Sequence, residues 1–276
     1  MDLLFCADAG VRQGVAMAAL SVADHTEGPL TFHLMTARLP DREPLDAGFA
    51  ARLEALLRET RPEARVRLYD MTGPFTADPP VANMATRFTP LCMLRLYADR
   101  IPELPDRLLY LDADVLCRKD FSDLYHADMK GAEIAGVPDR YGKWLYGRIW
   151  RHEYLNSGVL LLDMAAIRES GLFARCRALC RDREMFLPDQ HALNRLAKKR
   201  KLPRRYNEQG PLREETVFKH FSTFFRFFPR FRAVTVKPWQ PEAMHEVLGL
   251  YEFDDLLTRS QRSVMDEPRD SSLLRR

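Results

Sequence analysis

The sequence lacks any apolar run long enough to span a bilayer, which takes about 20 residues, so we expect no transmembrane helix. The first residues, MDLLFCADAGVRQG, have an acidic second position and only a short apolar stretch, unlike a secretory signal peptide. Both absences predict a cytoplasmic protein that is at most attached peripherally to the inner face of the cell membrane.

The sequence also lacks the marks of a disulfide scaffold, a zinc domain or a nucleic-acid-binding protein. Its five cysteines are odd in number and lack zinc-ligand spacing, which predicts reduced, packed thiols. The 42 basic and 39 acidic residues give a net charge of +3, too balanced for non-specific nucleic-acid binding. No repeat or low-complexity linker divides the chain. We therefore expect one main domain at residues 1–240 and a C-terminal helical extension with a polar tail at 241–276.

Short apolar strands alternate with helical patterns along most of the chain. Residues 3–7, 30–35 and 66–70 read as strands separated by apolar residues at helical spacing, and residues 133–137 and 156–163 read as two more strands. This order predicts an α/β fold with a Rossmann-like, mainly parallel, twisted sheet flanked by helices. Ligands of such sheets bind beyond the carboxyl ends of the strands.

The segments between these strands also carry predictions. Residues 73–90 are rich in Pro and Thr and predict a loop along the ligand-binding rim. Helices are predicted at 91–100, after the last strand through about residue 201, and from 241 to about 257. An aromatic-rich stretch at 141–154 joins two of the strands.

Two carboxylates follow the apolar run RLLYL. Asp112 and Asp114 are separated by one residue, and in an extended backbone residues two apart project to the same side. Such a pair would hold a hard divalent cation together with substrate phosphate oxygens. Two solvated acids in a surface turn explain the same pattern equally well, so the remaining motifs decide between the two.

Four stretches, RLLYLDADVLCRKDF, YLNSGVLLLD, LPDQHALN and VFKHF, together resemble the family-eight glycosyltransferases. The resemblance covers nearly all of residues 3–239. It implies the GT-A architecture and transfer of a sugar from a nucleotide sugar with retention of configuration. The implied activity resembles that of lipopolysaccharide galactosyl- and glucosyltransferases: glucose or galactose moves from a UDP-sugar to a hydroxyl of a glycan, glycolipid or glycoprotein acceptor.

The resemblance also implies a metal site made of Asp112, Asp114 and His220. Without it, a histidine on an apolar strand would be read as a core residue. Two carboxylates and one imidazole suit Mn²⁺ at least as well as Mg²⁺, because imidazole favours transition metals. We therefore expect Mn²⁺ as the cofactor, with Mg²⁺ as the alternative.

The same resemblance assigns the donor contacts. Asp8 receives the uracil edge and Ala7 lies against the base, although Asp8 could equally cap the following helix. Arg95, 17 positions before Asp112, is expected near the donor sugar and pyrophosphate. The other expected donor contacts are Asp112, Ala113, Asn156 and Ser157.

Three further residues match positions near the reacting atoms. Asp189 and Gln190 correspond to an acid and an amide beside the anomeric carbon, and Asp139 to an acid near donor or acceptor. Asp189 could also be a helix N-cap. His191 stands where the family has a second acid, which leaves the identity of the sugar open. We favour a same-face attack assisted by the leaving phosphate over a covalent route through a carboxylate or amide.

The last motif departs from the family pattern. Lys237 of the KPW sequence follows His220 by 17 positions, and Arg226 occupies the spacing at which the family has its lysine. We prefer Arg226 as the diphosphate contact and keep Lys237 as the alternative. The Phe and Arg cluster at 224–232 predicts strand packing, with contact to a membrane or a lipid-linked acceptor as the alternative.

Two rival functions remain at this point. A sugar nucleotidyltransferase would carry a Gly-rich phosphate loop after the first strand, which ADAGVRQG matches poorly. A non-catalytic nucleotide-sugar or glycan-binding homologue stays open because Gly10, Val11 and His191 depart from the family pattern. The oligomeric state is not predicted.

Overall fold

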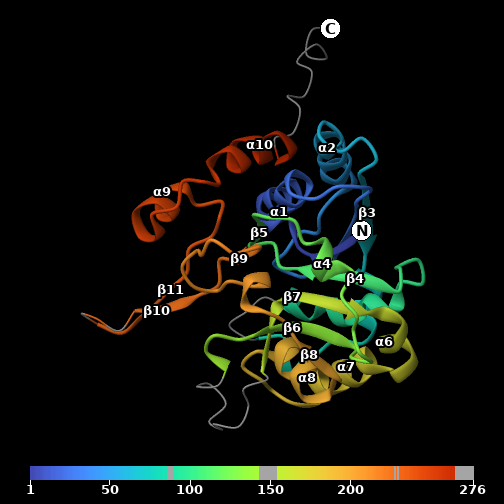
Figure 1. Cartoon of the computed structure of the whole chain (residues 1–276). Coiled ribbons are helices and arrows are strands. Elements are labelled where there is room, and N and C mark those ends of the chain that lie inside the picture. The colour runs from blue at the N-terminus through green and yellow to red at the C-terminus, as the bar shows by residue number, and fades with distance from the viewer. Residues whose placement is uncertain (86–89, 143–153, 227, 229, 265–276) are drawn as a thin grey trace, which may run out of the picture.

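A twisted sheet of seven strands forms the centre of the molecule (Figure 1). The computed structural model describes residues 1–85, 90–142, 154–226, 228 and 230–264. The strand order is β3-β2-β1-β4-β7-β6-β8. All neighbouring pairs are parallel except those of β7, which runs antiparallel to β4 and β6. The predicted α/β fold with a mainly parallel sheet is confirmed. The strands are β1 (Asp2–Cys6), β2 (Thr31–Thr36), β3 (Arg65–Asp70), β4 (Arg107–Leu111), β6 (Ile134–Pro138), β7 (Leu155–Asp163) and β8 (Lys199–Lys201).

The central strands direct successive side chains into two separate cores. In β1, Leu3 and Phe5 belong to one core and Leu4 to the other. In β4, Leu109 belongs to the first core and Leu108 to the second. Side chains alternate between the faces of a sheet, so near-continuous apolar strands require covering layers on both sides.

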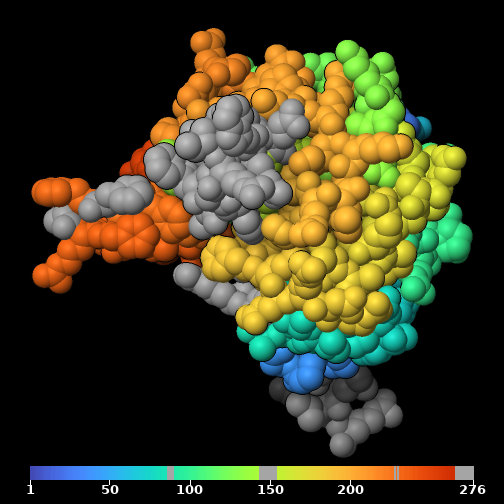
Figure 2. All heavy atoms as spheres, turned by 90° about the horizontal axis from the view of Figure 1, so that it is seen from below, coloured from blue at the N-terminus to red at the C-terminus, as the bar shows by residue number. Residues whose placement is uncertain are grey.

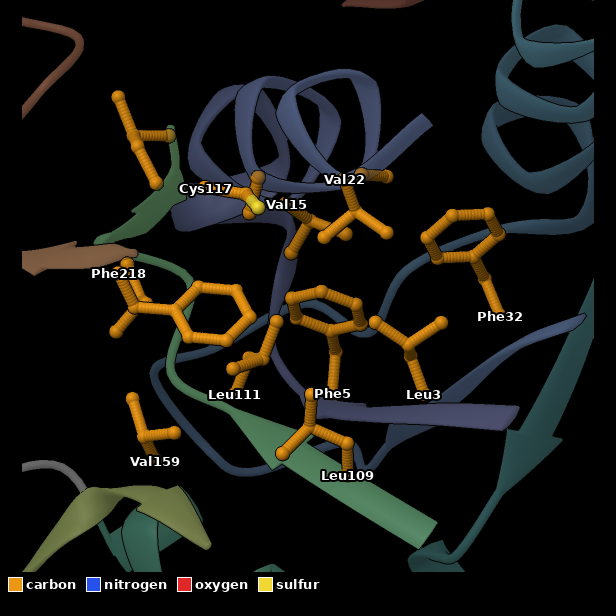
Figure 3. Packing of buried hydrophobic residues seen from close by; sticks show 14 of the residues in the cluster. Leu3, Phe5, Val15, Val22, Phe32, Leu109, Leu111, Cys117, Val159 and Phe218 are labelled. Carbon is orange, nitrogen blue, oxygen red and sulfur yellow. The ribbon is translucent and has the colours of Figure 1, made fainter. Parts of the chain in front are cut away.

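The first core lies between the sheet and the helices α1 (Arg12–Asp24), α2 (Ala47–Arg58) and α10 (Asp254–Val264). Figure 3 shows Phe5 pointing from β1 toward Val15 of α1, with Phe32 and Phe218 on either side. Complete burial of a Phe side chain typically stabilises a fold by about 2–3 kcal/mol.

The second core lies under η3 (Pro90–Arg100), α6 (Met164–Ser170), α7 (Leu172–Asp182) and α8 (Pro188–Leu196). Cys176 and Cys180 of α7 are buried here one helical turn apart. All five cysteines of the chain are free, as predicted.

The described part of the C-terminal extension packs onto the first core. Met244, Phe253 and Leu256 belong to the same apolar cluster as the strands. The guanidinium of Arg259 in α10 donates two hydrogen bonds to Asp24 at the end of α1, at 2.7 and 3.0 Å. The extension therefore shares its buried surface with the sheet.

Three local predictions differ from the structure. The predicted loop at 73–90 contains α3 (Thr72–Ala77) and a 3-10 turn, η2 (Val81–Asn83). Residues 199–201 form strand β8 instead of continuing a helix, because they pair with the free edge of β6. The predicted terminal helix is interrupted at Gly249, which has φ 64°, a conformation that glycine adopts without strain. It divides into α9 (Pro241–Ala243), a π turn, η5 (Met244–Leu248), and α10.

Two other expectations concern the surface. The aromatic-rich stretch at 141–154 lies mostly outside the described residues. Among the residues that are described, no helix has the length and apolarity to cross a membrane.

A two-stranded hairpin projects from the body of the protein (Figures 1 and 2). Its strands, β10 (Phe224–Arg226) and β11 (Arg232–Val234), pair antiparallel. The predicted strand packing applies to Phe225, whose ring contacts Tyr141 at a centroid distance of 4.8 Å. It fails for Phe228, which is 89% exposed, while Phe231 stacks on Phe225 and stays 66% exposed.

Gly14 allows α1 to lie directly against the segment that follows β4. A β-carbon at position 14 would clash with the ring of Trp239 and lie 2.7 Å from the carbonyl oxygen of Ala113. We expect Gly14→Ala to lower the free energy of unfolding by about 1–3 kcal/mol, because overpacking outweighs the gain in helix propensity. Urea denaturation measures the change.

Gly73 in α3 provides the matched control, since a β-carbon there would meet no atom within 4 Å. Gly73→Ala should leave the unfolding free energy unchanged or raise it by up to about 1 kcal/mol. An unchanged or higher stability of Gly14→Ala would contradict the close packing.

Candidate functional site

A tight turn after β4 brings Asp112 and Asp114 together at the rim of the sheet. The N–H of Val115 donates to the carbonyl oxygen of Asp112 at 3.1 Å, which closes the turn. The sequence argument relied on alternation in an extended strand, and this was wrong in its cause. The two carboxylates converge because the backbone reverses between β4 and the short strand β5 (Val115–Cys117).

His220 reaches the same place from a distant part of the chain. It ends β9 (Phe218–His220), which pairs antiparallel with β5 so that His220 lies opposite Val115. Its Nε2 lies 3.4 Å from Oδ1 of Asp114 and 3.9 Å from Oδ2 of Asp112. One potential ligand atom from each of the three residues lies within 4.8 Å of the others, so the structure brings the predicted metal ligands together.

Gly158 of β7 leaves the space that this convergence needs. A β-carbon at position 158 would lie 2.7 Å from Nδ1 of His220 and 2.9 Å from Oδ2 of Asp112. Both distances are shorter than contacts to real β-carbons. A residue with a side chain at this position would force the histidine and the carboxylate apart.

Asp112 is oriented by two donors on one of its oxygens. The hydroxyl of Tyr110 and a guanidinium nitrogen of Arg95 donate to Oδ1 at 2.7 and 2.9 Å. The guanidinium carbon also lies 4.0 Å from the centroid of the Tyr110 ring. The second oxygen of Asp112 is therefore directed toward His220.

His220 is oriented by Asn207. The amide nitrogen of Asn207 donates to Oδ1 of Asn156 at 2.9 Å, so its oxygen faces the imidazole. The Nδ1–H of His220 then donates to that oxygen at 3.1 Å, which leaves the lone pair of Nε2 directed toward the two carboxylates. A second hydrogen bond of this kind is a regular feature of metal-binding histidines. This donor set fits a divalent cation.

Lys237 forms an ion pair with Oδ2 of Asp114. Burial alone would raise the pKa of Asp114, but the positive charge of Lys237 and the nearby His220 outweigh burial and hold this pKa well below its usual value. Burial opposes the charge of Lys237 as well, yet its contact with Asp114 raises the pKa of the ammonium group. Both groups are therefore charged at neutral pH.

A cavity of about 430 Å³ opens from the three predicted metal ligands. Its wall contains a hydrogen-bonded group of side chains at the start of β7 and α8. The amide of Gln190 accepts from the backbone N–H of Ser157 at 2.9 Å and donates to Oδ2 of Asp139 at 3.2 Å. Asn156 donates to the same oxygen of Asp139 at 2.9 Å. The amide plane of Gln190 is thus fixed from both ends.

Asp189 lies in the first turn of α8, behind Gln190. The helix begins at Pro188, and its N-cap position is Leu187, so the alternative that Asp189 is the N-cap is wrong. Asp189 is only 3% exposed; it accepts from the hydroxyl of Ser157 at 3.1 Å and lies 3.4 Å from Nε of Arg95. Its charge is therefore compensated within the wall.

Arg95 joins these two parts of the site. It is 4% exposed and contacts both Asp112 and Asp189. Burial disfavours its charge, but the neighbouring Tyr110, Asp112 and Asp189 raise the pKa of Arg95 well above its usual value. Its guanidinium is a permanent positive charge between two carboxylates.

Four predicted site residues lie outside the described lining of this cavity: Ala7, Asp8, Ala113 and Arg226. Asp8 accepts from the N–H of Gly10 at 2.8 Å, which caps the 3-10 turn η1 (Ala9–Val11), and it pairs with Arg42 at 2.9 Å. Ala7 is buried beside it at the end of β1.

Arg226 points away from the predicted metal ligands. It donates to the carbonyl oxygen of Val247 in η5 at 3.1 Å, whereas Lys237 lines the cavity. The preference for Arg226 over Lys237 is therefore revised. The cause is the β10–β11 hairpin, which carries Arg226 outward and returns the chain to the site at Lys237.

Sequence reasoning missed Tyr110, Gly158 and Asn207 as parts of the site. Tyr110 lies two residues before Asp112 on the same strand, and Gly158 lies within the NSG sequence, so both were near a recognised motif. Asn207 belongs to an irregular segment after the 3-10 turn η4 (Arg204–Tyr206), where no pattern marks it.

Comparisons with known proteins agree with this architecture. The model of the family described as Glycosyl transferase family 8 matches residues 2–240. The lipopolysaccharide 1,2-glucosyltransferase of Escherichia coli K12 is 25% identical over 288 aligned positions, which cover 98% of this chain and 81% of that protein.

Solved structures share the fold at low sequence identity. The galactosyltransferase LgtC in complex with donor and acceptor sugar analogues superposes with a TM-score of 0.65 at 20% identity, covering 98% of each chain. The bifunctional glycosyltransferase WbbM superposes with a TM-score of 0.69 at 14% identity, and the present chain spans 49% of its length.

The hydrogen bond from His220 to Asn207 generates a prediction about metal affinity. We expect Asn207→Ala to weaken Mn²⁺ binding about 10- to 100-fold, because the imidazole loses the partner that fixes its tautomer. Titration of Mn²⁺ by isothermal calorimetry measures the affinity.

Asn83→Ala is the control. Asn83 is an equally buried amide whose side chain donates to the carbonyl oxygen of Arg183 at 2.6 Å, outside the cavity lining. This variant should lose stability but bind Mn²⁺ like the unaltered protein. Unchanged affinity in Asn207→Ala would show that the imidazole needs no such support.

Proposed function

This chain belongs to glycosyltransferase family 8 and is a retaining hexosyltransferase of the GT-A fold, and we propose that it transfers glucose or galactose from a UDP-sugar with the help of Mn²⁺. The observation that carries the proposal is the convergence of Asp112, Asp114 and His220 at the sheet rim. Membership of this family replaces the sugar-nucleotidyltransferase alternative, and the similarity to a glucosyltransferase over 98% of the chain favours the enzyme over a non-catalytic homologue.

We assign the cation to the three converging side chains. Their two carboxylates and one imidazole suit Mn²⁺, and Mg²⁺ is the alternative. When bound, a divalent cation supplies Lewis-acid stabilisation of the diphosphate leaving group, a contribution of several kcal/mol. Tyr110 and Asn207 would act by orienting Asp112 and His220.

We propose Lys237 as the residue that binds the diphosphate. Its ammonium lies at the metal ligand Asp114 inside the cavity, so phosphate oxygens at that cation would lie within its reach. Arg95 would stabilise the donor site indirectly, because its guanidinium is already engaged by Asp112 and Asp189.

Donor hydroxyls would meet Asn156 and Ser157, which line the cavity, with Asp189 beside them in its wall. For the base, we retain Asp8 and Ala7, supported by their position at the carboxyl end of β1, with Ala113 on the neighbouring turn. The carboxylate of Asp8 already accepts from Arg42 and from the N–H of Gly10, and its two oxygens have capacity for a further donor from the base.

The carboxylates near the proposed sugar position favour retention without a covalent protein intermediate. Asp139 accepts hydrogen bonds from Asn156, Gln190 and the N–H of Tyr141, and Asp189 pairs with Arg95. Carboxylates that are held by several donors are weak nucleophiles. We therefore propose that the acceptor hydroxyl attacks on the face that the diphosphate leaves, beside the amide of Gln190.

The acceptor, by this proposal, is a sugar of a glycolipid or a related cell-surface glycan, and the enzyme works at the cytoplasmic face of the membrane. Support comes from the name of the Escherichia coli relative, a lipopolysaccharide glucosyltransferase. We further propose residues 1–240 as the catalytic domain and 241–276 as an extension, supported by the family match that ends at residue 240.

Asp114→Asn tests the metal assignment. We expect it to abolish Mn²⁺-dependent UDP binding while the protein remains folded, because a neutral amide is a weak ligand for a divalent cation. Calorimetric titration of UDP with and without Mn²⁺ measures the effect, and circular dichroism checks the fold. Asp106→Asn, at a surface carboxylate paired with Arg168, should bind UDP normally. Equal UDP affinities for both variants would exclude the proposed metal site.

A pair of variants separates the two candidates for the diphosphate contact. Lys237→Met should weaken UDP binding about 10-fold or more and UMP binding less, since a charge-assisted hydrogen bond to phosphate is lost. Arg226→Met, the matched control, should alter neither affinity. The reverse ranking would restore Arg226 to the site.

A further inference from the structure

The tip of the β10–β11 hairpin presents exposed aromatic and basic side chains together. We use the term hairpin tip for Phe228, Arg230, Phe231 and Arg232. Phe228 is 89% exposed and Phe231 is 66% exposed, while both arginines are exposed as well. Single exposed apolar residues are common on soluble proteins. Two of the five large apolar side chains that are exposed within the described residues, however, lie three positions apart here.

The sequence that forms the hairpin is basic. The sequence contains no Asp or Glu from position 216 to 241, but it contains Lys219, Arg226, Arg230, Arg232 and Lys237. Of these, Lys219 is buried and Lys237 is paired with Asp114, whereas Arg230 and Arg232 are exposed. Ion pairs found within the described part of the chain do not involve Arg230 or Arg232.

The base of the hairpin forms part of the cavity wall. Phe225 and Ala233, on the two strands of the hairpin, line the cavity together with Thr235. The ring of Phe225 stacks on that of Phe231 at a centroid distance of 5.5 Å. Figure 1 shows the hairpin extending outward from the body of the protein, so its outer end is free to touch a surface.

We propose that the hairpin tip docks on an anionic lipid bilayer. The aromatic rings of Phe228 and Phe231 would enter the interface between headgroups and acyl chains, and Arg230 and Arg232 would pair with lipid phosphates. Arginine suits this position because its stem packs on apolar groups while its guanidinium binds phosphate. A soluble protein partner would also cover the aromatic rings, but a one-sided positive charge favours an anionic surface.

Docking would deepen the proposed function and rests on it in one respect, the lipid-borne acceptor. An acceptor anchored in the same bilayer would be held on the side of the protein that carries the hairpin, whose base lines the cavity. Binding of the hairpin to lipid needs neither donor nor acceptor. The two proposals can therefore fail separately.

Flotation of the full chain with vesicles tests the docking. We expect it to float with vesicles of phosphatidylcholine and phosphatidylglycerol and to remain unbound with phosphatidylcholine alone. The double variant Phe228→Ser/Phe231→Ser should lose at least about 10-fold in affinity for the mixed vesicles, because two aromatic side chains leave the interface. Phe228→Trp, which keeps an interfacial aromatic ring, should bind like the unaltered chain.

Charge is tested separately by Arg230→Gln/Arg232→Gln. This variant should lose about 25-fold in affinity for the mixed vesicles, since each of the two basic residues near an anionic surface contributes on the order of a factor of five. The same loss should follow when the unaltered chain is transferred to high salt. UDP binding, measured by calorimetry, should be unchanged in all hairpin-tip variants.

Tyr251→Ser is the matched control, because Tyr251 is an aromatic residue that is 63% exposed outside the hairpin. It should float like the unaltered chain. The proposal is overturned if the unaltered chain does not bind anionic vesicles, a result that would leave a protein partner as the occupant. It is also overturned if the hairpin-tip variants bind the vesicles as well as the unaltered chain, which would locate membrane contact elsewhere.

Discussion

The short ladder between β5 and β9 is the contact on which the candidate site depends. It sets His220 opposite Val115 and so beside the turn that carries Asp112 and Asp114. The N–H of Phe221 donates to the carbonyl oxygen of Asp114 at 3.0 Å, which continues this pairing past the histidine. Backbone hydrogen bonds, rather than side-chain attraction, thus assemble a site from segments more than a hundred positions apart in the sequence.

Charge compensation allows so many carboxylates to share one cavity. Asp112 and Asp189 are held by the guanidinium of Arg95, and Asp114 is held by Lys237. Buried charges are tolerated only with such partners, because each isolated ion would cost several kcal/mol of desolvation. The arrangement also divides the acids by role. Asp189, which is held by Arg95 and Ser157, forms part of the cavity wall. The oxygens of Asp112 and Asp114 that face His220 remain available to a cation.

The sheet could be predicted from the sequence because apolar strand patterns are local signals. The grouping of Asp112 and Asp114 with His220 could be predicted because the order of motifs resembles a known family. The turn that brings Asp112 and Asp114 together could not be predicted, since it is closed by a hydrogen bond from the N–H of Val115 to the carbonyl oxygen of Asp112 that no sequence pattern marks. Asn207 escaped notice because its role follows only from the neighbours that folding supplies, His220 and Asn156. The break at Gly249 was missed because the apolar stripe of the predicted terminal helix continues past that glycine.

The position of Arg226 shows why counting along the sequence from His220 can mislead. Counting positions from His220 assumes that the backbone advances steadily, but the β10–β11 hairpin leaves the body and returns, so the sequence distance grows while the spatial distance does not. The hydroxyls of Thr223 and Thr235 form a hydrogen bond of 2.7 Å at the base of the hairpin, which holds the two ends of the hairpin together. Lys237 thereby reaches Asp114 despite the 17 positions between it and His220. The closed hairpin therefore adds an outer surface while residues at its base, such as Thr223 and Thr235, line the cavity.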